Sequence, residues 1–220
     1  MASLTDTNAI EEETYDDYTA SEFYPAHVGE VIKSPTQGGG AYELLGKLGF
    51  GRHSTVWLCR GIDRDREASD EDATFYTLKI SIVHDAGTPN READIYTHIQ
   101  SLSSPHEGRA YIRNLHEAFE LEGPEEGGAR RKHWCLVHAP LGISLRDYQD
   151  TFPGSRYPVG VLKGVVRRLL HALDFLHREA AVIHTDIQPS NVLLALPPRT
   201  EGGEEAIRAF VDAERENPAP

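Results

Sequence analysis

The sequence has little sulfur and few basic side chains. Its 220 residues include two cysteines, one methionine and two tryptophans, and 22 lysines and arginines face 35 aspartates and glutamates. Two cysteines cannot supply the disulfide framework of a small secreted domain. Cys59 and Cys135 each lie in an apolar, strand-like stretch, where a buried free thiol is more common than a bridge. A reducing, intracellular compartment is therefore expected.

The shortage of positive charge limits the partners. The formal net charge is −13 at pH 7. Nucleic acids and membrane surfaces are themselves negative, so neither is expected to bind this chain directly, whereas a basic partner is favoured. No apolar run approaches the length of a membrane span, and the first residues show no basic segment followed by an apolar run. We expect a soluble, unsecreted protein of the cytoplasm, the nucleus or both.

Composition changes along the chain in a way that predicts its organisation. Residues 1–22 are acidic and hold few large aliphatic side chains, so they are predicted to be a disordered tail that cannot offset its ordering entropy. Strand-like segments begin at Tyr42, after a run of three glycines. Segments 61–73 and 122–132 are charged and lack periodicity, which predicts solvated loops.

Two segments show helical periodicity between and after the strands. A short helix is predicted after Asn90, and a long one over Val161–Arg178, where six apolar residues share one face. Segment Glu204–Glu216 predicts a short exposed helix. The order of strands, one helix, strands, a long helix and a polar loop indicates an α+β fold with a sheet-dominated lobe followed by a helical one.

The first candidate site is the run Leu48–Val56 between two strand-like segments. Gly49 and Gly51 would let the backbone approach phosphate oxygens and direct N–H groups at them. A lone G-x-G also fits an ordinary hairpin turn. The absence of a following helix disfavours a dinucleotide-binding fingerprint.

The second candidate is Lys79, within the alternating pattern Tyr76–Ile82 that predicts a half-buried strand. A lysine on the inner face of a sheet needs a counter-charge, because an unpaired buried charge is costly. Glu92, on the short helix that follows, is the obvious partner. The alternative is that both residues face solvent, and this pair gains weight only together with other motifs.

The third candidate carries the most weight. It is the run His184–Asn191, HTDIQPSN, which precedes an apolar segment predicted to be a strand, Val192–Leu194. An aspartate near a phosphate acceptor can orient or accept its hydroxyl proton, and an asparagine five residues on can hold a magnesium ion from the same loop. A polar turn before a strand is the other interpretation.

Together these motifs resemble the eukaryotic-type protein kinase superfamily. Residues 48–58 (LGFGRHSTVWL) and 183–194 (IHTDIQPSNVLL) are similar to the serine/arginine-rich-protein kinases, particularly their fungal relatives. Thr185 points to this subfamily, because most protein kinases carry arginine at that position to bind a phosphorylated activation loop. The absence of this arginine implies that activation-loop phosphorylation is not required.

The resemblance implies a protein-kinase-like fold, with a complete antiparallel β N-lobe and the beginning of a helical C-lobe. The implied parts are a disordered tail at 1–22, the N-lobe and hinge at 23–142, a partial C-lobe at 143–217 that ends after the catalytic loop, and a tail at 218–220. The implied cofactors are ATP and Mg²⁺. Asp186 would be the catalytic base, Asn191 a magnesium ligand, and Lys79 would hold the α and β phosphates with Glu92 fixing it.

The resemblance also implies which residues meet the nucleotide. His138 would be the gatekeeper, and the Ala139 carbonyl and the Leu141 N–H would meet adenine. Pro140 between them need not donate an N–H. The complete set of implied nucleotide-binding positions is Leu48, Gly49, Phe50, Gly51, Val56, Lys79, Glu92, His138, Ala139 and Leu141.

The sequence departs from the family pattern at several positions. Ser54 replaces a common third glycine and His53 a common aromatic, and neither change is disabling. Gln188 replaces the lysine that supports the transferring phosphoryl group, so a weakened chemical step is expected. No Asp-Phe-Gly follows Asn191, so the aspartate that would bind the bridging magnesium ion lies outside this sequence. A truncated nucleotide-lobe portion, whose apolar long helix would associate, is the corresponding expectation.

The leading hypothesis is an ATP-dependent serine/threonine protein kinase acting on basic, Arg/Ser-rich protein substrates, with Asp186, Lys79 and Gln188 as its catalytic residues. Two alternatives stay open. One is a catalytically impaired, kinase-like module for nucleotide binding or interaction. The other is a small-molecule phosphotransferase, which shares the H-x-D-x-x-x-x-N pattern. Pro189 and the run Ser54–Leu58 favour a protein kinase over this last class.

Overall fold

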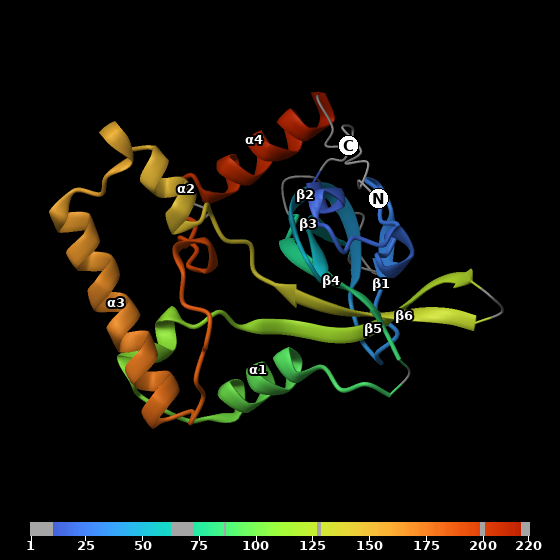
Figure 1. Ribbon diagram of the computed structural model, residues 1–220, viewed down its shortest axis with the longest axis horizontal. Helices are drawn as coiled ribbons and strands as arrows, with labels where there is room; N and C mark the ends of the chain where they lie inside the picture. The colour runs from blue at the N-terminus through green and yellow to red at the C-terminus, as the bar shows by residue number, and fades with distance from the viewer. Residues whose placement is uncertain (1–10, 63–72, 86, 127–128, 199–200, 217–220) are drawn as a thin grey trace, which may run out of the picture. The chain divides into compact units, whose positions relative to one another are not determined.

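The computed structural model describes residues 11–62, 73–85, 87–126, 129–198 and 201–216 (Figure 1). The chain divides into two compact units. The first consists of Met1–Thr88, His116–His138 and Glu205–Pro220, and the second of Pro89–Leu115 and Ala139–Glu204. Within the described residues, no helix is both long and apolar enough to cross a bilayer.

The first unit is built around a six-stranded sheet with the order β1-β2-β3-β4-β6-β5 (Figure 1). Strands β1 to β4 pair antiparallel in sequence, and β4 pairs antiparallel with β6. The strands are β1 Val31–Lys33, β2 Ala41–Gly51, β3 Ser54–Ile62, β4 Phe75–His84, β5 Leu115–Glu126 and β6 Ala129–His138. The α+β fold class predicted from the sequence is confirmed. Strand β1 precedes the predicted start of the strands, and its three residues are too few to give an alternating pattern.

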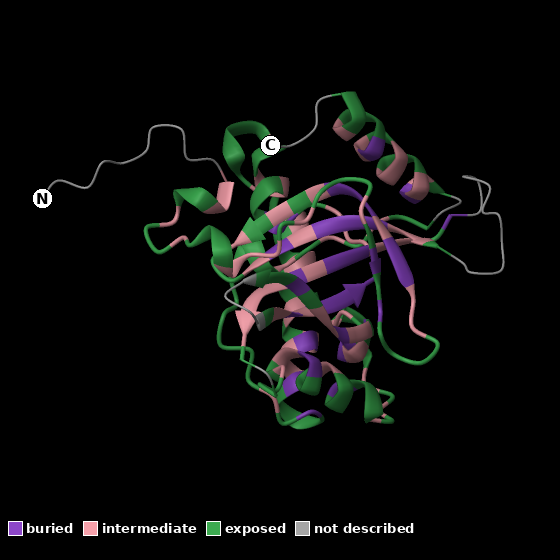
Figure 2. Cartoon of the chain, turned by 90° about the vertical axis from the view of Figure 1, so that its right-hand side faces the viewer, coloured by how far each residue is buried: buried purple, intermediate pink, exposed green. Residues whose placement is uncertain are grey.

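One face of the sheet carries the main core. Because side chains alternate between faces, residues that are paired across strands lie on the same side. Ten buried residues form this cluster, which we call the core face, and Figure 2 shows buried residues concentrated along the strands. The cluster is Ile32, Tyr42, Leu44, Trp57, Cys59, Leu78, Ile80, Phe119, Cys135 and Val137.

Both cysteines belong to this core and are free, as the sequence predicted. Burial raises the pKa of the Cys59 thiol to about 12, and burial also raises the pKa of Cys135 well above its usual value. Both thiols therefore stay protonated near neutral pH, and they serve as small apolar side chains rather than as nucleophiles.

Helix α4, Gly203–Glu216, covers part of the opposite face of the sheet. Its residues Ile207, Phe210 and Val211 pack in one cluster with Leu45 and Leu58, and with Phe75, and Figure 1 shows the helix beside β2 and β3. A Cβ at Gly46 would approach Phe210 Cε1 to 3.0 Å, so the helix comes close to the backbone of β2. The helix was predicted, but the expectation that it is exposed is wrong.

The segment before β1 also differs from the prediction of a disordered tail. Residues 1–10 lie outside the described part of the chain. Residues Glu11–Thr14 and Ala20–Glu22 form short 3-10 helices. Lys47 Nζ donates to Glu12 Oε2 at 2.7 Å, so the first of these helices contacts β2. Disorder was predicted from the acidic composition of the segment alone. That composition does not show the basic partner Lys47, which lies 35 residues after Glu12.

The second unit is helical. It holds α1 Arg91–Ser101, α2 Leu145–Asp150 and α3 Val159–Arg178. The Asn90 side chain accepts a hydrogen bond from the Ala93 N–H at 3.0 Å, which caps α1 where the sequence predicted a helix to begin. Phe175, Leu176 and Ile99 form the centre of a buried cluster between α3 and α1. Both predicted helices are confirmed, with α3 beginning two residues earlier than expected.

Two predicted segments are corrected by the structure. Residues 122–132 were predicted to be a loop, yet β5 and β6 extend through most of them, and only residues 127–128 lie outside the description. Cross-strand ion pairs join the two strands here, with Arg130 bound to Glu122 at 2.9 Å and Lys132 to Glu120 at 2.7 Å. The predicted strand Val192–Leu194 is reduced to a single bridge between Ser144 and Leu193. Most of the predicted loop 61–73 lies outside the described residues.

Thr77 lies on the face of the sheet opposite the core face and gives a prediction about the stability of the fold. Its side-chain hydroxyl is buried and has no hydrogen-bond partner among the described residues. A buried polar group without a partner costs about 1–3 kcal/mol, whereas valine has nearly the same shape and no polar atom. Thr77→Val is therefore expected to raise the free energy of unfolding by about 1 kcal/mol in urea titrations. The matched control is Thr55→Val, because the Thr55 hydroxyl accepts from Trp57 Nε1 at 3.0 Å, and its loss should destabilise. Equal effects of the two variants would contradict the assignment.

Candidate nucleotide and catalytic-loop sites

The glycine-rich turn is the tip of the hairpin β2–β3. Gly49 pairs with Val56, Phe50 with Thr55 and Gly51 with Ser54. A Cβ added at Gly49 would meet no atom within 4 Å, so the turn has an unfilled side at this glycine. Leu48 and Phe50 are exposed at 43% and 41%. The unfilled side at Gly49 can accept a ligand.

Lys79 lies on the face opposite the core. It pairs with Val56 of β3 and with Leu136 of β6, so its side chain shares their face of the sheet. His138 pairs with Thr77 and belongs to the same face, and its side chain is buried. The first unit thus aligns Val56, Lys79 and His138 on one surface, which we call the nucleotide face. Phe50 pairs with Thr55 and lies on the core face, so only its backbone can serve the nucleotide face.

Two further predicted residues, Ala139 and Leu141, follow β6 in the sequence and belong to the second unit. Ala139 is exposed and its carbonyl accepts a hydrogen bond from Arg113 Nη2 at 3.0 Å. Burial lowers the pKa of Arg113, while Tyr96 and Glu92 oppose that shift. A carbonyl has two lone pairs and can accept a second hydrogen bond from adenine. Sequence reasoning missed Arg113, which had no motif around it.

Glu92 lies in the first turn of α1, within the second unit. Lys79 belongs to the first unit, so the two residues of the predicted pair belong to different units, and their pairing stays a prediction.

Leu141 is partly buried, and the N–H of the next residue, Gly142, donates to the Leu194 carbonyl at 2.8 Å. The segment Leu141–Leu145 is thereby joined to the end of the predicted catalytic loop.

The structure brings three predicted catalytic-loop residues together. The Gln188 Nε2 donates to both carboxylate oxygens of Asp186, at 3.1 and 3.3 Å. The Asn191 Nδ2 donates to Asp186 Oδ2 at 2.6 Å and to the Asp186 carbonyl at 3.1 Å. The backbone N–H of Asp186 donates to His184 Nδ1 at 3.3 Å. The aspartate is therefore held in one orientation by neighbours on both sides.

Backbone geometry contributes to this loop. Thr185 has a φ of 67°, in the left-handed region that non-glycine residues rarely adopt, and its hydroxyl donates to the His184 carbonyl at 2.7 Å. A short 3-10 helix, Pro189–Asn191, then returns the chain so that Asn191 reaches Asp186. Strained backbone of this kind persists only where surrounding hydrogen bonds hold it, and it is common in functional loops.

The same loop can be tested as a metal site. Asp186 and Asn191 offer oxygen atoms of the type that hard divalent cations prefer. Because the Asn191 amide nitrogen is used by Asp186, its Oδ1 is the atom left for a cation. These donors fit a divalent ion in kind, but they are few, and the described residues contain no group of three or more His, Cys, Asp or Glu side chains suited to a metal.

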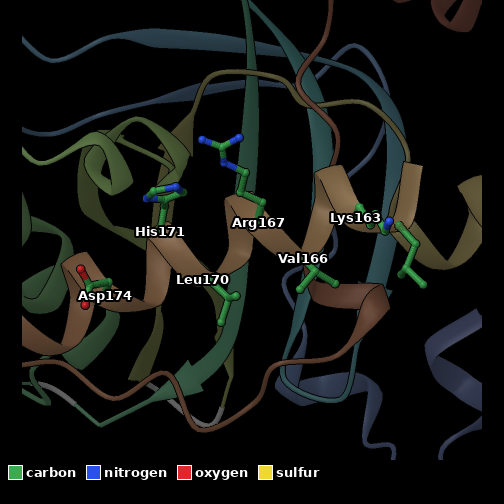
Figure 3. Close-up of a pocket in the computed structure, with 7 residues that line it drawn as sticks. Lys163, Val166, Arg167, Leu170, His171 and Asp174 are labelled. Carbon is green, nitrogen blue, oxygen red and sulfur yellow. The ribbon is translucent and has the colours of Figure 1, made fainter. Parts of the chain in front are cut away.

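A separate hollow of about 700 Å³ lies along α3 (Figure 3). It is lined by Leu162, Lys163, Val166, Arg167, Leu170, His171 and Asp174, all of them on this one helix. None of the predicted site residues lines it. Val159 and Leu170 are 67% and 61% exposed, so α3 presents apolar side chains from its start as far as Leu170. Its buried residues, Ala172, Phe175 and Leu176, lie beyond that point.

Comparison with known proteins agrees with the motifs. No family model matches the chain. It is 38% identical over 177 residues to a serine/threonine protein kinase of Aspergillus fumigatus, a match that covers 80% of this chain and 40% of the relative. It is 34% identical over 196 residues to protein kinase dsk1 of Schizosaccharomyces pombe, covering 88% of this chain and 33% of the relative.

A third relative is animal. SRSF protein kinase 3 of Mus musculus is 32% identical over 198 residues, which is 89% of this chain and 32% of the relative. The chain thus spans about a third to two fifths of the length of the curated relatives it matches. Protein kinases of this type use ATP together with a divalent metal ion. Over most of its length this chain is homologous to serine/threonine protein kinases, mainly SRSF protein kinases, as its motifs indicated.

Proposed function

We propose that this chain carries the ATP-binding part and the catalytic loop of a serine/threonine protein kinase that transfers the γ-phosphoryl group of ATP to a protein hydroxyl. The observation that supports this most is the geometry of the catalytic loop, where Asp186 is held by Gln188 and Asn191. A carboxylate fixed in this way can accept the proton of an incoming hydroxyl group.

The residues take the roles that their positions allow. The backbone of the turn Leu48–Val56 covers the phosphates, Lys79 binds the α and β phosphates, and Glu92 supports Lys79. His138, Ala139 and Leu141 meet the adenine. Asn191 would hold Mg²⁺ through its amide oxygen, and the ion would neutralise charge on the transferring phosphoryl group.

The proposed substrates are basic proteins rich in arginine and serine. The net charge of −13 favours association with an arginine-rich chain, and several relatives are named SRSF protein kinases. The proposed location is the cytoplasm, the nucleus or both. Direct binding of nucleic acid or of a membrane is not part of the proposal, because the same charge opposes it.

The experiment that tests this function compares acceptors. A complete version of the kinase that contains this chain is incubated with Mg²⁺ and γ-labelled ATP, and with either an arginine-serine repeat peptide or an aminoglycoside. Label on the peptide alone is the expected result. Label on the aminoglycoside would identify a small-molecule phosphotransferase instead. ATP binding with no transfer to either acceptor would support a nucleotide-binding module, which the neutral amide at Gln188 also favours.

Gln188 gives a prediction about the rate of transfer. Its amide binds Asp186, but it offers only a neutral hydrogen bond to the phosphoryl group. In a complete version of the kinase, Gln188→Lys is expected to raise kcat for peptide phosphorylation about tenfold, because a cation stabilises the charge that spreads over the transferring oxygens. Gln37→Lys adds the same charge at an exposed position of the first unit and serves as the control. Unchanged turnover in Gln188→Lys would contradict the expectation.

A further inference from the structure

Residues Glu11–Asp17 lie against the glycine-rich turn, and we call this segment the amino-terminal strap. It contains five carboxylates, a threonine and a tyrosine in seven residues. The strap contacts two cationic side chains, Lys47 of β2 and Arg52 of the turn that follows β2. The two cations lie on either side of Gly49 and Gly51, so the strap contacts the turn on both flanks.

The contact at Lys47 is the most buried. Its side chain is only 8% exposed, and its ammonium group donates to Glu11 and, at 2.7 and 3.0 Å, to both oxygens of Glu12. Burial by itself lowers the pKa of Lys47, but the hydrogen bonds that its ammonium group donates to the two glutamates outweigh this and raise the pKa above its ordinary value. The lysine is therefore charged, and it depends on the strap for its counter-charge.

Three weaker contacts continue along the turn. The Tyr15 ring meets the Phe50 ring edge-on, with their centroids 6.1 Å apart. Arg52 stacks over the same Tyr15 ring at 5.4 Å and forms an ion pair with Asp17. Both members of that ion pair are more than half exposed, so the pair contributes little, and the rings and Lys47 carry most of the contact.

The strap lies on the core face of the sheet. Lys47 pairs with Trp57 and Phe50 with Thr55, and both partners belong to that face. Val56 and Lys79 lie on the nucleotide face, which is the other side. The strap therefore does not cover the nucleotide face, and it can act on a nucleotide only through the position of the turn.

The turn has little packing of its own at its glycines. A Cβ at Gly49 would meet no atom within 4 Å, and one at Gly51 would meet only Ser54 at 3.9 Å. Glycine also has the largest conformational freedom to lose when a segment becomes ordered. We infer that the amino-terminal strap positions the glycine-rich turn for the phosphates of the nucleotide, so that Glu11, Glu12 and Tyr15 are positioning residues for ATP. This inference rests on the proposed function.

Two accounts of the strap predict opposite changes in ATP affinity when its carboxylates are neutralised: one in which only their negative charge matters, and one in which they hold the turn in place. If its carboxylates acted only through their charge, their removal would tighten the binding of the negatively charged ATP. If they hold the turn, their removal adds an ordering cost to binding, and ATP binds more weakly. Adenosine has no phosphates, so its affinity should stay the same under the positioning account.

The test is a calorimetric comparison of the 220-residue chain with the variant E11Q/E12Q/D17N. The dissociation constant for ATP is expected to rise about threefold to tenfold, while that for adenosine is unchanged. The control D85N/E125Q/E216Q removes the same number of charges from exposed positions of the first unit outside the strap, and it should leave both constants unchanged. Tighter or equal ATP binding by the strap variant would overturn the inference.

A second measurement does not require nucleotide. Amide hydrogen exchange of residues 48–56 should be at least about threefold faster in the strap variant, while exchange in β4 and β6 stays as it was. Unchanged exchange in a chain that binds ATP would overturn the role of the strap alone. Failure of the unaltered chain to bind ATP would overturn the proposed function and the phosphate role of the strap with it, whatever the exchange rates show.

Discussion

Lys79→Met is expected to weaken ATP binding about tenfold to a hundredfold while the affinity for adenosine stays the same. The change removes the one positive charge that β4 presents on the nucleotide face beside Val56, and a hydrogen bond to a phosphate from a charged donor is among the stronger polar contacts. Methionine keeps the length of the side chain, so the strand should remain intact. Calorimetric titration with ATP and with adenosine measures both affinities.

The matched control for Lys79→Met is Lys33→Met. Lys33 is exposed on β1, at the edge of the sheet, and it carries the same charge. The control variant should bind ATP as the unaltered chain does. If both variants lose affinity equally, the effect comes from the overall charge of the protein. If neither loses affinity, Lys79 does not bind phosphate.

Gly108→Ala is expected to destabilise the second unit by about 3 kcal/mol. A Cβ at this position would lie 1.9 Å from the His171 carbonyl oxygen and 2.8 Å from the Phe175 Cβ. Both atoms belong to α3, and neither is the end of a flexible side chain, so the 3-10 helix Glu107–Tyr111 would have to move away from α3. Hydrogen exchange of the α3 amides measures the loss of stability.

Gly160→Ala is the control for this prediction. Gly160 lies in the first turn of α3, where an added Cβ meets no atom within 4 Å. Alanine is the better helix former, so this variant should gain about 0.5 kcal/mol. Similar effects of the two substitutions would show that the close approach of Gly108 to α3 does not limit stability.

Local patterns predicted those parts of the fold that depend on neighbouring residues. The apolar spacing in Val161–Arg178 identified α3, and the change to helical periodicity after Asn90 identified the start of α1. The HTDIQPSN run likewise predicted that Asp186, Gln188 and Asn191 lie together, because they fall within six residues and contact each other through one short 3-10 helix.

Contacts between distant segments were not predictable in the same way. Helix α4 was expected to be exposed, although Ile207, Phe210 and Val211 already have the spacing of an amphipathic face. Its partners Leu45 and Leu58 lie about 150 residues earlier. Leu45 is at an irregularity of β2, next to Gly46, which pairs with Leu58, so alternation along the strand does not predict that Leu45 and Leu58 pack together. The signal was present, but its partner was not identifiable.

The acidic strap was missed for an electrostatic reason. Composition predicts disorder for a segment such as Glu11–Asp17, because it holds many like charges and few apolar groups. That rule does not include counter-charges elsewhere in the chain. Lys47 and Arg52 supply them, and the Tyr15 ring adds the apolar contact with Phe50 that the count of aliphatic residues leaves out.

The location of the bound nucleotide is the most direct test of the whole account. Amide hydrogen exchange of the chain is measured with and without ATP and Mg²⁺. Protection is expected at residues 48–56, at 77–79 and at 138–141, with no change in the hollow along α3 (Figure 3). Protection that is confined to α3, or absent from both the glycine-rich turn and Lys79, would contradict a kinase-type nucleotide site in this chain.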